Sequence, residues 1–156
     1  MVKLILDTNL LILYMLGSYR PDMISMCNYT SKYGKDDYLL LKTFINKQSL
    51  ICITPHILTE LSNQSFFLKE PGRSDFFNVI VRKLSKMDEE YISLNHLLQH
   101  TDLLPKIGFT DVSIYELAKK QEYVVLTDDF PLHQILSSRR INSLSFAHLQ
   151  GGFWGL

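Results

Sequence analysis

Four acidic residues that lie far apart in the chain are its clearest candidates for chemistry. Asp7 follows an apolar run, Glu60 and Asp111 lie in helical patterns, and Asp129 follows another apolar run. Taken singly, each has an ordinary structural interpretation as a helix cap, a solvated helix residue or a turn residue. Their carboxylates gain a chemical meaning only if the fold brings them together.

Carboxylates that meet in a fold require something to offset their repulsion. Two of them about 4 Å apart repel by roughly 4 kcal/mol at an effective dielectric constant near ~20, so protonation or a bound cation is needed. Oxygen ligands without a cluster of cysteines or histidines favour Mg²⁺ or Mn²⁺ over zinc. Such an ion keeps open positions for phosphate oxygens and activates water. The expected chemistry is therefore hydrolysis of a phosphodiester bond.

The order of strand and helix patterns indicates how these acids could meet. Short apolar runs without alternation suit parallel strands that are covered on both faces, and helical patterns separate them. This order predicts a layered α/β fold with a mostly parallel sheet, in which strand carboxyl ends and helix amino ends share one edge. Glu60 lies more than one turn inside its helix, but helical side chains lean toward the amino end and can reach that edge. The expected strands span residues 2–6, 50–53, 123–126 and 141–146, and the expected helices span 9–17, 36–47, 55–69, 75–87, 88–100, 111–121 and 131–138.

Length and composition indicate a single globular domain over residues 1–156. The 16 lysines and arginines balance 16 acidic residues, so a surface coated with positive charge is not expected and any polyanion must be held locally. The zero net charge is a weak sign of self-association or of a bound partner. Cys27 and Cys52 form no disulfide framework or zinc motif, which fits a reducing cytoplasm. No apolar run reaches the ~20 residues that span a bilayer, so no membrane partner is expected.

The acids lie in four stretches of sequence: LILDTNLLI, TPHILTELSN, GFTDVSIYELA and VVLTDDF. In order and spacing these stretches resemble the four motifs of PIN-domain ribonucleases, a family that includes VapC-type toxins. The resemblance covers the chain from Leu4 to about Phe130. DTN and TEL have limited specificity singly, whereas the four motifs in order are a strong signal. The resemblance implies a three-layer α/β/α sandwich with a central, mostly parallel sheet and metal-dependent cleavage of single-stranded or structured RNA.

Carried over position by position, the resemblance also implies a role for each motif residue. Asn9 and Thr127 would be polar supports that orient Asp7 and Asp129 through hydrogen bonds. Asp128 stands where many relatives carry asparagine or another polar residue, so it is a candidate auxiliary ligand. The catalytic and metal-binding acids, with Mg²⁺ or Mn²⁺ as the cofactor, would be Asp7, Glu60, Asp111 and Asp129.

Two segments with basic residues are open to more than one interpretation. The stretch from residue 17 to 35 is longer than expected between the first motif and the next helix of a small toxin, and it either contacts RNA or forms a solvated loop. The pairs Lys119–Lys120 and Arg139–Arg140 either bind a phosphate backbone or are solvated helix ends. The aromatic and basic residues of the long stretch are Tyr19, Arg20, Tyr29, Lys32, Tyr33 and Lys35.

The histidines and the carboxyl-terminal segment carry weaker signals. His56, near Glu60, either lines the acid site or has a capping or surface role. His96 and His100 are four residues apart, but HLLQH lacks the glutamate of the HExxH zinc motif, which disfavours a metal role. The tail GGFWGL ends in apolar residues that are expected to dock on the body of the protein or on a partner.

The leading hypothesis is a Mg²⁺- or Mn²⁺-dependent endoribonuclease, with the role of a toxin in a toxin–antitoxin pair as its biological context. The expected partners are RNA, an antitoxin protein and a second copy of the chain. A haloacid-dehalogenase-type phosphatase would need an acid two residues after Asp7, where the chain has Asn9. The other alternative is a catalytically inactive PIN-like binding or assembly module, against which the complete set of acids argues.

Overall fold

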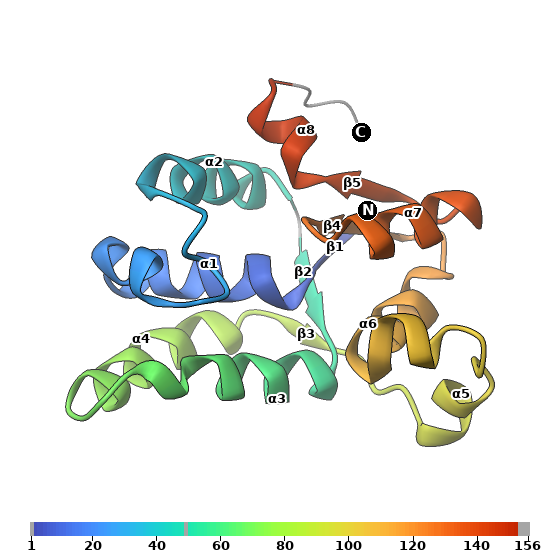
Figure 1. Ribbon diagram of the computed structural model, residues 1–156, viewed down its shortest axis with the longest axis horizontal. Coiled ribbons are helices and arrows are strands. Elements are labelled where there is room, and N and C mark those ends of the chain that lie inside the picture. The colour runs from blue at the N-terminus through green and yellow to red at the C-terminus, as the bar shows by residue number, and fades with distance from the viewer. Residues whose placement is uncertain (1, 49, 153–156) are drawn as a thin grey trace.

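The computed structural model describes residues 2–48 and 50–152, which fold around a five-stranded parallel sheet with the strand order β3-β2-β1-β4-β5 (Figure 1). The central strands β1 and β4 are apolar and almost wholly buried, as expected of a parallel sheet with both faces covered. The expectation of a layered α/β fold is confirmed. The strands are β1 (Lys3–Leu6), β2 (Leu50–Ile53), β3 (Asp88–Glu89), β4 (Tyr123–Thr127) and β5 (Ser143–Ser145).

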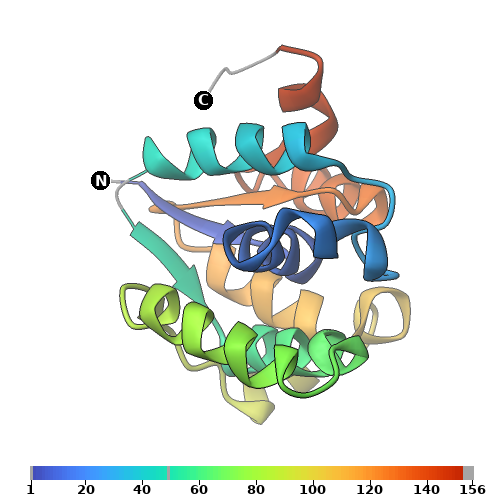
Figure 2. The same cartoon turned by 90° about the vertical axis from the view of Figure 1, so that its left-hand side faces the viewer.

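Helices cover both faces of the sheet and form a three-layer α/β/α sandwich. The chain steps from β1 to β2 to β3, and then returns to β4 and β5 on the other side of β1. Because parallel crossovers are right-handed, these two directions place their helices on opposite faces. Figures 1 and 2 show α1 to α4 on one face and α5 to α7 on the other. The helices are α1 (Thr8–Tyr19), α2 (Lys35–Asn46), α3 (Pro55–Gln64), α4 (Gly72–Leu84), α5 (Leu94–Leu98), α6 (Leu104–Ala118), α7 (Phe130–Ser138) and α8 (Phe146–Gln150), with 3-10 turns η1 (Pro21–Met26) and η2 (Ser65–Phe67).

The first helix, α1, is the centre of one layer. It contacts α2, α3 and α4, and every residue from Leu10 to Leu16 is buried. A helix enclosed on all sides needs no polar face, which explains why its sequence is apolar throughout. The buried apolar residues form a cluster that extends from Leu4 in β1 to Leu149 in α8.

The strand order reverses between β1 and β4, and this reversal creates a crevice. The two strands are in register, with Leu6 opposite Leu126, so they end at the same level. The amide of Asp7, just past β1, donates a 3.1 Å hydrogen bond to the carbonyl oxygen of Leu126. In open α/β sheets, ligands bind at such a switch point, beyond the carboxyl ends of the strands.

The prediction of one helix from the sequence is wrong. The expected helix over 88–100 is instead the edge strand β3, which pairs with the end of β2, followed by a loop and the short helix α5. An acid suits the start of a helix, but it also suits a short, exposed edge strand. Ser93, rather than Asp88, caps the helix here, since its hydroxyl accepts a hydrogen bond from the amide of His96.

The long stretch after the first motif is packed rather than extended into solvent. α1 continues to Tyr19, η1 follows, and Ile24, Thr30 and Tyr33 are buried. Tyr29 and Lys32 remain exposed. The segment is therefore an integral part of the layer that contains α1 and α2.

The sequence also raised two expectations about a membrane partner and about the carboxyl-terminal tail. The part of the chain that the structure describes contains no helix whose length and apolar character would carry it across a bilayer. Phe153, Trp154 and Leu156, on which the expected docking of the tail depends, lie outside the described residues.

Candidate active site

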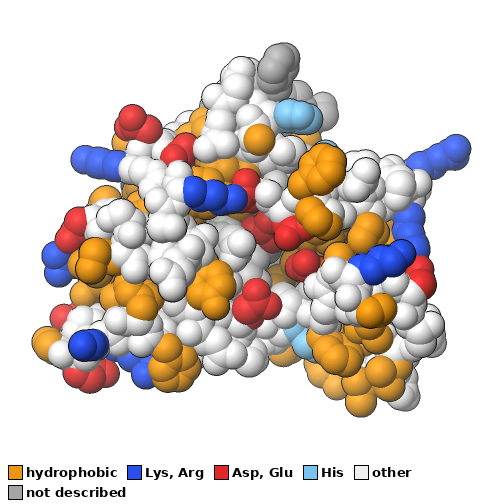
Figure 3. All heavy atoms as spheres, viewed as in Figure 1, with side chains coloured by type: hydrophobic (Ala, Val, Ile, Leu, Met, Phe, Trp, Pro, Cys, Tyr) orange, Lys and Arg blue, Asp and Glu red, His pale blue; other side chains and the backbone are white. Residues whose placement is uncertain are grey.

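The four acids from the four motifs line one small hollow at the switch point of the sheet. Its volume is about 70 Å³, and a water molecule takes up about 30 Å³ of liquid volume, so it has room for an ion with one or two waters. Figure 3 shows acidic side chains gathered at the centre of this face, between the helices of the two outer layers. The hollow is lined by Asp7, Thr8, Asn9, Glu60, Asp111 and Asp129.

Asp7 is buried and held by three donors. Its Oδ1 accepts a 2.8 Å hydrogen bond from the amide of Leu10, which caps α1, and its Oδ2 accepts a 2.8 Å bond from the amide of Asp128. The hydroxyl of Thr127 also donates to Oδ2. Burial raises the pKa of Asp7 above its ordinary value, and the three donors oppose this by stabilising the carboxylate. The side chain is thereby fixed at the end of β1.

Asp129 caps the next helix and keeps one carboxylate oxygen available. Its Oδ1 accepts a 2.8 Å hydrogen bond from the amide of Leu132 in α7. Its own amide donates a 2.9 Å bond to the hydroxyl oxygen of Thr127. Since Thr127 also contacts Asp7, this one hydroxyl lies between two of the acids. Among the described residues, no donor is bonded to Oδ2 of Asp129.

Glu60 and Asn9 are joined by a glutamine that the sequence analysis missed. Nε2 of Gln64 donates to Oδ1 of Asn9 at 3.1 Å and contacts Oε1 of Glu60 at 3.5 Å. Gln64 is buried and lies one turn after Glu60 on α3, a spacing that could have identified it from sequence. Asn9 therefore acts on the acids through Gln64 and not by a direct bond to Asp7.

Asp111 shows that the four acids share one electrostatic field. Burial raises its pKa to about 8, with further increases from the negative charges of Asp129, Asp7 and Glu60, in that order.

Gly108 has a φ of 76°, a left-handed conformation that favours glycine. It interrupts α6, and the helical turn that carries Asp111 begins after this break.

A buried pair of hydroxyls aligns the helices that carry Glu60 and Asp111. Thr54 caps α3 and its hydroxyl lies 2.9 Å from that of Ser113 in α6. Both side chains are fully buried. The two acids thus face the hollow from helices that are fixed to each other, and neither hydroxyl was singled out from the sequence.

The donor set suits a hard divalent cation. Carboxylate oxygens are the ligands that Mg²⁺ and Mn²⁺ prefer. The hydroxyl of Thr8 and Oε1 of Gln64 are buried nearby without a hydrogen-bond partner in the described part of the chain, and such atoms suit the waters that an ion carries.

Coordination would require some movement of the side chains. Within residues 2–48 and 50–152, no group of three or more acidic, histidine or cysteine side chains converges closely enough to hold an ion in the conformations shown. Caps hold Asp7 and Asp129 in place. Glu60 and Asp111, which cap no helix, are the two acids whose side chains would have to turn inward.

Asp128 lies beside the hollow, with its carboxylate turned to a lysine. It forms an ion pair with Lys32, which comes from the long stretch between the first motif and α2. The neighbouring Tyr33 has a buried hydroxyl, and its pKa is raised by burial and by the negative charge of Asp128. The structure therefore gives Asp128 a cationic partner, which comes from the long stretch that the sequence left open between an RNA contact and a solvated loop.

The basic pairs lie at the other ends of α6 and α7. Lys119 follows Asp111 by eight positions, which is about 12 Å of helix, and Arg139 follows Asp129 by about 15 Å. Three of the four basic residues have an acidic partner: Lys119 pairs with Glu116 at 2.8 Å, Lys120 with Glu90 at 3.5 Å, and Arg139 with Asp102 at 2.8 Å. Arg140 follows Arg139 just past the end of α7. The structure thus does not bring these residues to the hollow.

Comparison with known proteins adds no assignment to this geometry, because no protein-family model matches the chain and no curated protein matches it.

Proposed function

We propose that the protein is a Mg²⁺- or Mn²⁺-dependent endoribonuclease whose active site is the acidic hollow between β1 and β4. The observation that carries this proposal is the convergence of four acids, from four separate segments, on a space of about 70 Å³. The raised pKa of Asp111 supports it, because a site that holds excess negative charge in the absence of a cation is suited to bind one.

The acids of the site would hold the cation, and the cation would offset their repulsion of an RNA phosphate. Asp7 and Asp129 provide fixed carboxylates, and Glu60 and Asp111 complete the set. Without a cation, this much negative charge would repel an RNA phosphate. When bound, Mg²⁺ or Mn²⁺ supplies an activated water and offsets the charge that develops on the phosphate. Thr127 keeps Asp7 and Asp129 in position for that role.

The choice of RNA as the substrate rests on the resemblance to PIN-domain ribonucleases. The same resemblance is the basis for proposing a toxin role, an antitoxin partner and a homodimer. The acidic hollow itself supports cation-dependent chemistry at a phosphate, which is the part of the proposal that the geometry addresses.

The decisive experiment is cleavage of a labelled RNA with Mn²⁺, with EDTA, and with the variant Asp111→Asn. We expect cleavage by the wild type with Mn²⁺ and a loss of at least ~100-fold in the variant and with EDTA. Asp111 caps no helix, so its substitution does not remove a structural hydrogen bond. Asp75→Asn, at an exposed acid in α4, is the matched control. Equal cleavage in all four conditions would refute the proposal.

Calorimetric titration with Mn²⁺ separates the nuclease from the inactive binding module. We expect the wild type to bind Mn²⁺ at neutral pH and Asp111→Asn to bind it more weakly. No binding by the wild type would favour the module, in which the acids would serve another purpose.

A further inference from the structure

A second, larger hollow adjoins the acid site. Its volume is about 390 Å³, within the range of about 300–1,000 Å³ that is typical of pockets for small molecules. Glu60 lines both hollows, so they share a wall. We call this second hollow the α3–α6 groove. It is lined by Pro55, His56, Thr59, Glu60, Asn63 and Thr110.

The α3–α6 groove is formed by one face of α3 and the restarted part of α6. His56, Glu60 and Asn63 recur at intervals of four and three residues, which places them on the same face of the helix. Thr110 comes from α6, just before the acid Asp111. A ligand in the groove would therefore lie immediately beside the acid hollow.

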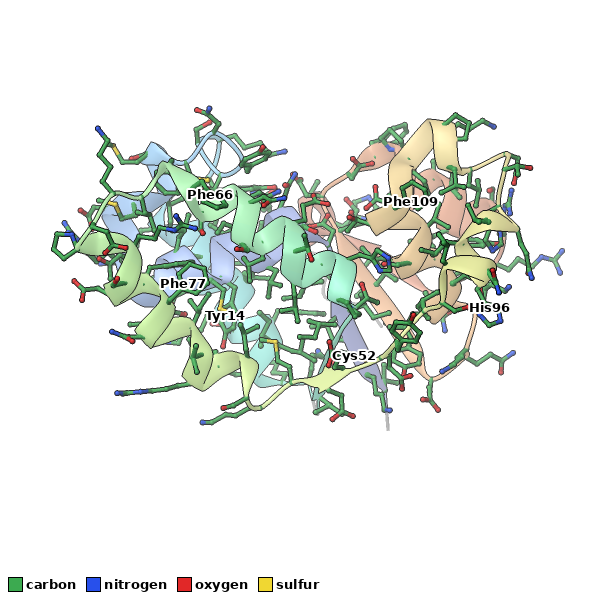
Figure 4. The ribbon with its side chains drawn as sticks, turned by 90° about the horizontal axis from the view of Figure 1, so that it is seen from below. Tyr14, Cys52, Phe66, Phe77, His96 and Phe109 are labelled. Carbon is green, nitrogen blue, oxygen red and sulfur yellow. The ribbon has the colours of Figure 1, made fainter. Side chains whose placement is uncertain are left out.

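The polar groups of the groove can form hydrogen bonds with the edge of a ligand. His56 lines the groove, and its Nδ1 is buried without a hydrogen-bond partner among the described residues, so this nitrogen reaches a ligand when the imidazole ring turns. Asn63 is exposed, and its carboxamide can both donate and accept. Phe109, which precedes Thr110 and is labelled in Figure 4, is 50% exposed and adds an aromatic surface at this end of α6. Such a combination suits a flat heteroaromatic ring with donors and acceptors on its rim.

The charge of the groove distinguishes a base from a phosphate. Its lining contains one acid, Glu60, and neither lysine nor arginine. A phosphate would meet repulsion there, whereas a nucleobase is neutral and forms hydrogen bonds with amides, hydroxyls and imidazoles. The bases of a duplex have their pairing edges occupied, so only an unpaired base can present those edges to His56 and Asn63.

We infer that the α3–α6 groove binds one unpaired base of the RNA, next to the phosphate at the acid hollow, and so makes the enzyme selective for single-stranded RNA and for base type. His56 and Asn63 read the base edge, and the shared wall at Glu60 sets the distance to the phosphate. This inference rests on the proposed function for its choice of RNA.

The test measures RNA binding without cleavage. Short fluorescein-labelled RNAs of one base type (oligo-U, oligo-A and oligo-C) and a fully paired, blunt-ended duplex are titrated with protein in Ca²⁺, and binding is followed by fluorescence anisotropy. We expect a base preference of about fivefold or more in the wild type and weaker binding of the duplex. His56→Ala and Asn63→Ala are expected to weaken binding of the preferred RNA about five- to tenfold and to reduce the preference.

The controls remove the same groups from α5. Asn95 and His96 are exposed residues of that helix outside the groove lining, and Figure 4 labels His96. The variants His96→Ala and Asn95→Ala are expected to bind RNA like the wild type. Mn²⁺ affinity, measured by calorimetry, is expected to stay unchanged in all four variants, which shows that the acid site is intact.

The outcomes separate this inference from the proposed function. Equal binding of all base types, equal binding of the blunt-ended duplex, or wild-type behaviour of both groove variants would overturn the groove as a base site, even if Mn²⁺-dependent cleavage is observed. A base preference that His56→Ala and Asn63→Ala abolish would support it, even if the wild type cleaves none of the RNAs and the nuclease proposal fails.

Discussion

The hydroxyl of Thr127, at the end of β4, donates a hydrogen bond to Oδ2 of Asp7, at the end of β1. Both side chains are buried, and the same hydroxyl accepts a 2.9 Å bond from the amide of Asp129. Because the pKa of Asp7 is raised by burial, a donor that favours its carboxylate form helps to keep the site able to bind a cation. Thr127 thus links two acids that are far apart in sequence.

Removal of this hydroxyl is expected to weaken metal binding. Thr127→Val keeps the shape of the side chain but loses the donor to Asp7 and the acceptor for Asp129. Loss of a residue that orients metal ligands typically costs about 10–100-fold in affinity, and we expect a loss in this range for Mn²⁺ by calorimetry at neutral pH. Thr127→Ser keeps the hydroxyl and is expected to stay within a few fold of the wild type. Similar affinities for the two variants would contradict the role given to the hydroxyl.

The raised pKa of Asp111 predicts how stability depends on pH without metal. Its pKa is about 8 in the folded protein against an ordinary 3.8, so the folded state binds the proton more tightly than the unfolded state. The contribution of Asp111 to stability is fully present below about pH 4 and is lost as pH rises toward about 8. Asp111→Asn, which cannot ionise, is therefore expected to be more stable than the wild type at pH 8, by on the order of 2–5 kcal/mol, and equal near pH 4.

Urea unfolding in EDTA at the two pH values measures this difference. Asp75→Asn, at an exposed position, is expected to show no such change between the two pH values. Excess Mn²⁺ should reverse the order at pH 8, because the wild type then gains binding free energy that the variant largely lacks. A variant that is less stable than the wild type at pH 8 in EDTA would contradict the electrostatic account of the site.

Metal binding should also release a proton from Asp111. At pH 7 its carboxyl group is mostly protonated, since its pKa is about 8, and a ligand to Mn²⁺ must be ionised. We expect close to one proton released per site, seen as a dependence of the calorimetric enthalpy on the ionisation enthalpy of the buffer. Asp111→Asn is expected to release about one proton fewer than the wild type. An enthalpy independent of the buffer in the wild type would mean that Asp111 is already ionised.

The sequence predicts the position of acids that directly follow buried parallel strands. Asp7 and Asp129 follow buried strands, and a parallel sheet brings such positions to one edge, so their meeting could be predicted before any coordinates. The position of Glu60 beside that edge also follows from its sequence, because helical side chains lean toward the amino end of the helix. These predictions depend on backbone periodicity, which the sequence displays directly.

What the sequence did not reveal depends on tertiary contacts. Gln64 is an ordinary helix residue until α1 brings Asn9 within hydrogen-bond distance of it. Lys32 lies in a stretch with no regular pattern, and only packing of that stretch places it on Asp128. The two residues of β3 are too few to show a strand pattern, and their assignment follows from bonding to β2.

The contact between α1 and α2 leaves no room for a side chain at Gly17. A Cβ atom there would lie 2.2 Å from Cδ2 of the buried Tyr38 ring. We expect Gly17→Ala to lower the free energy of unfolding by about 1–2 kcal/mol, since overpacking costs roughly 1–3 kcal/mol and the helix propensity of alanine returns up to about 1. Gly72→Ala, where the nearest atom would be 3.5 Å away, is the control and is expected to be neutral in urea unfolding. Equal stability of both variants would show that α2 can shift freely against α1.

The ion pair between Lys32 and Asp128 predicts a role for this lysine in binding RNA. Lys32 is 60% exposed and pairs with Asp128, which directly precedes Asp129 of the acid hollow, so its charge lies near the site that a phosphate would enter. Under the proposed function, Lys32→Ala should weaken RNA binding a few fold and reduce the slope of log affinity against log salt by about 0.7, the value for one phosphate contact on a single strand. Mn²⁺ affinity should not fall, because the substitution removes a positive charge near the acids. Lys86→Ala makes the same charge change beside the start of β2, at the opposite edge of the sheet, and is expected to leave the salt slope unchanged. A slope equal to that of the wild type in Lys32→Ala would mean that this lysine serves only to hold Asp128.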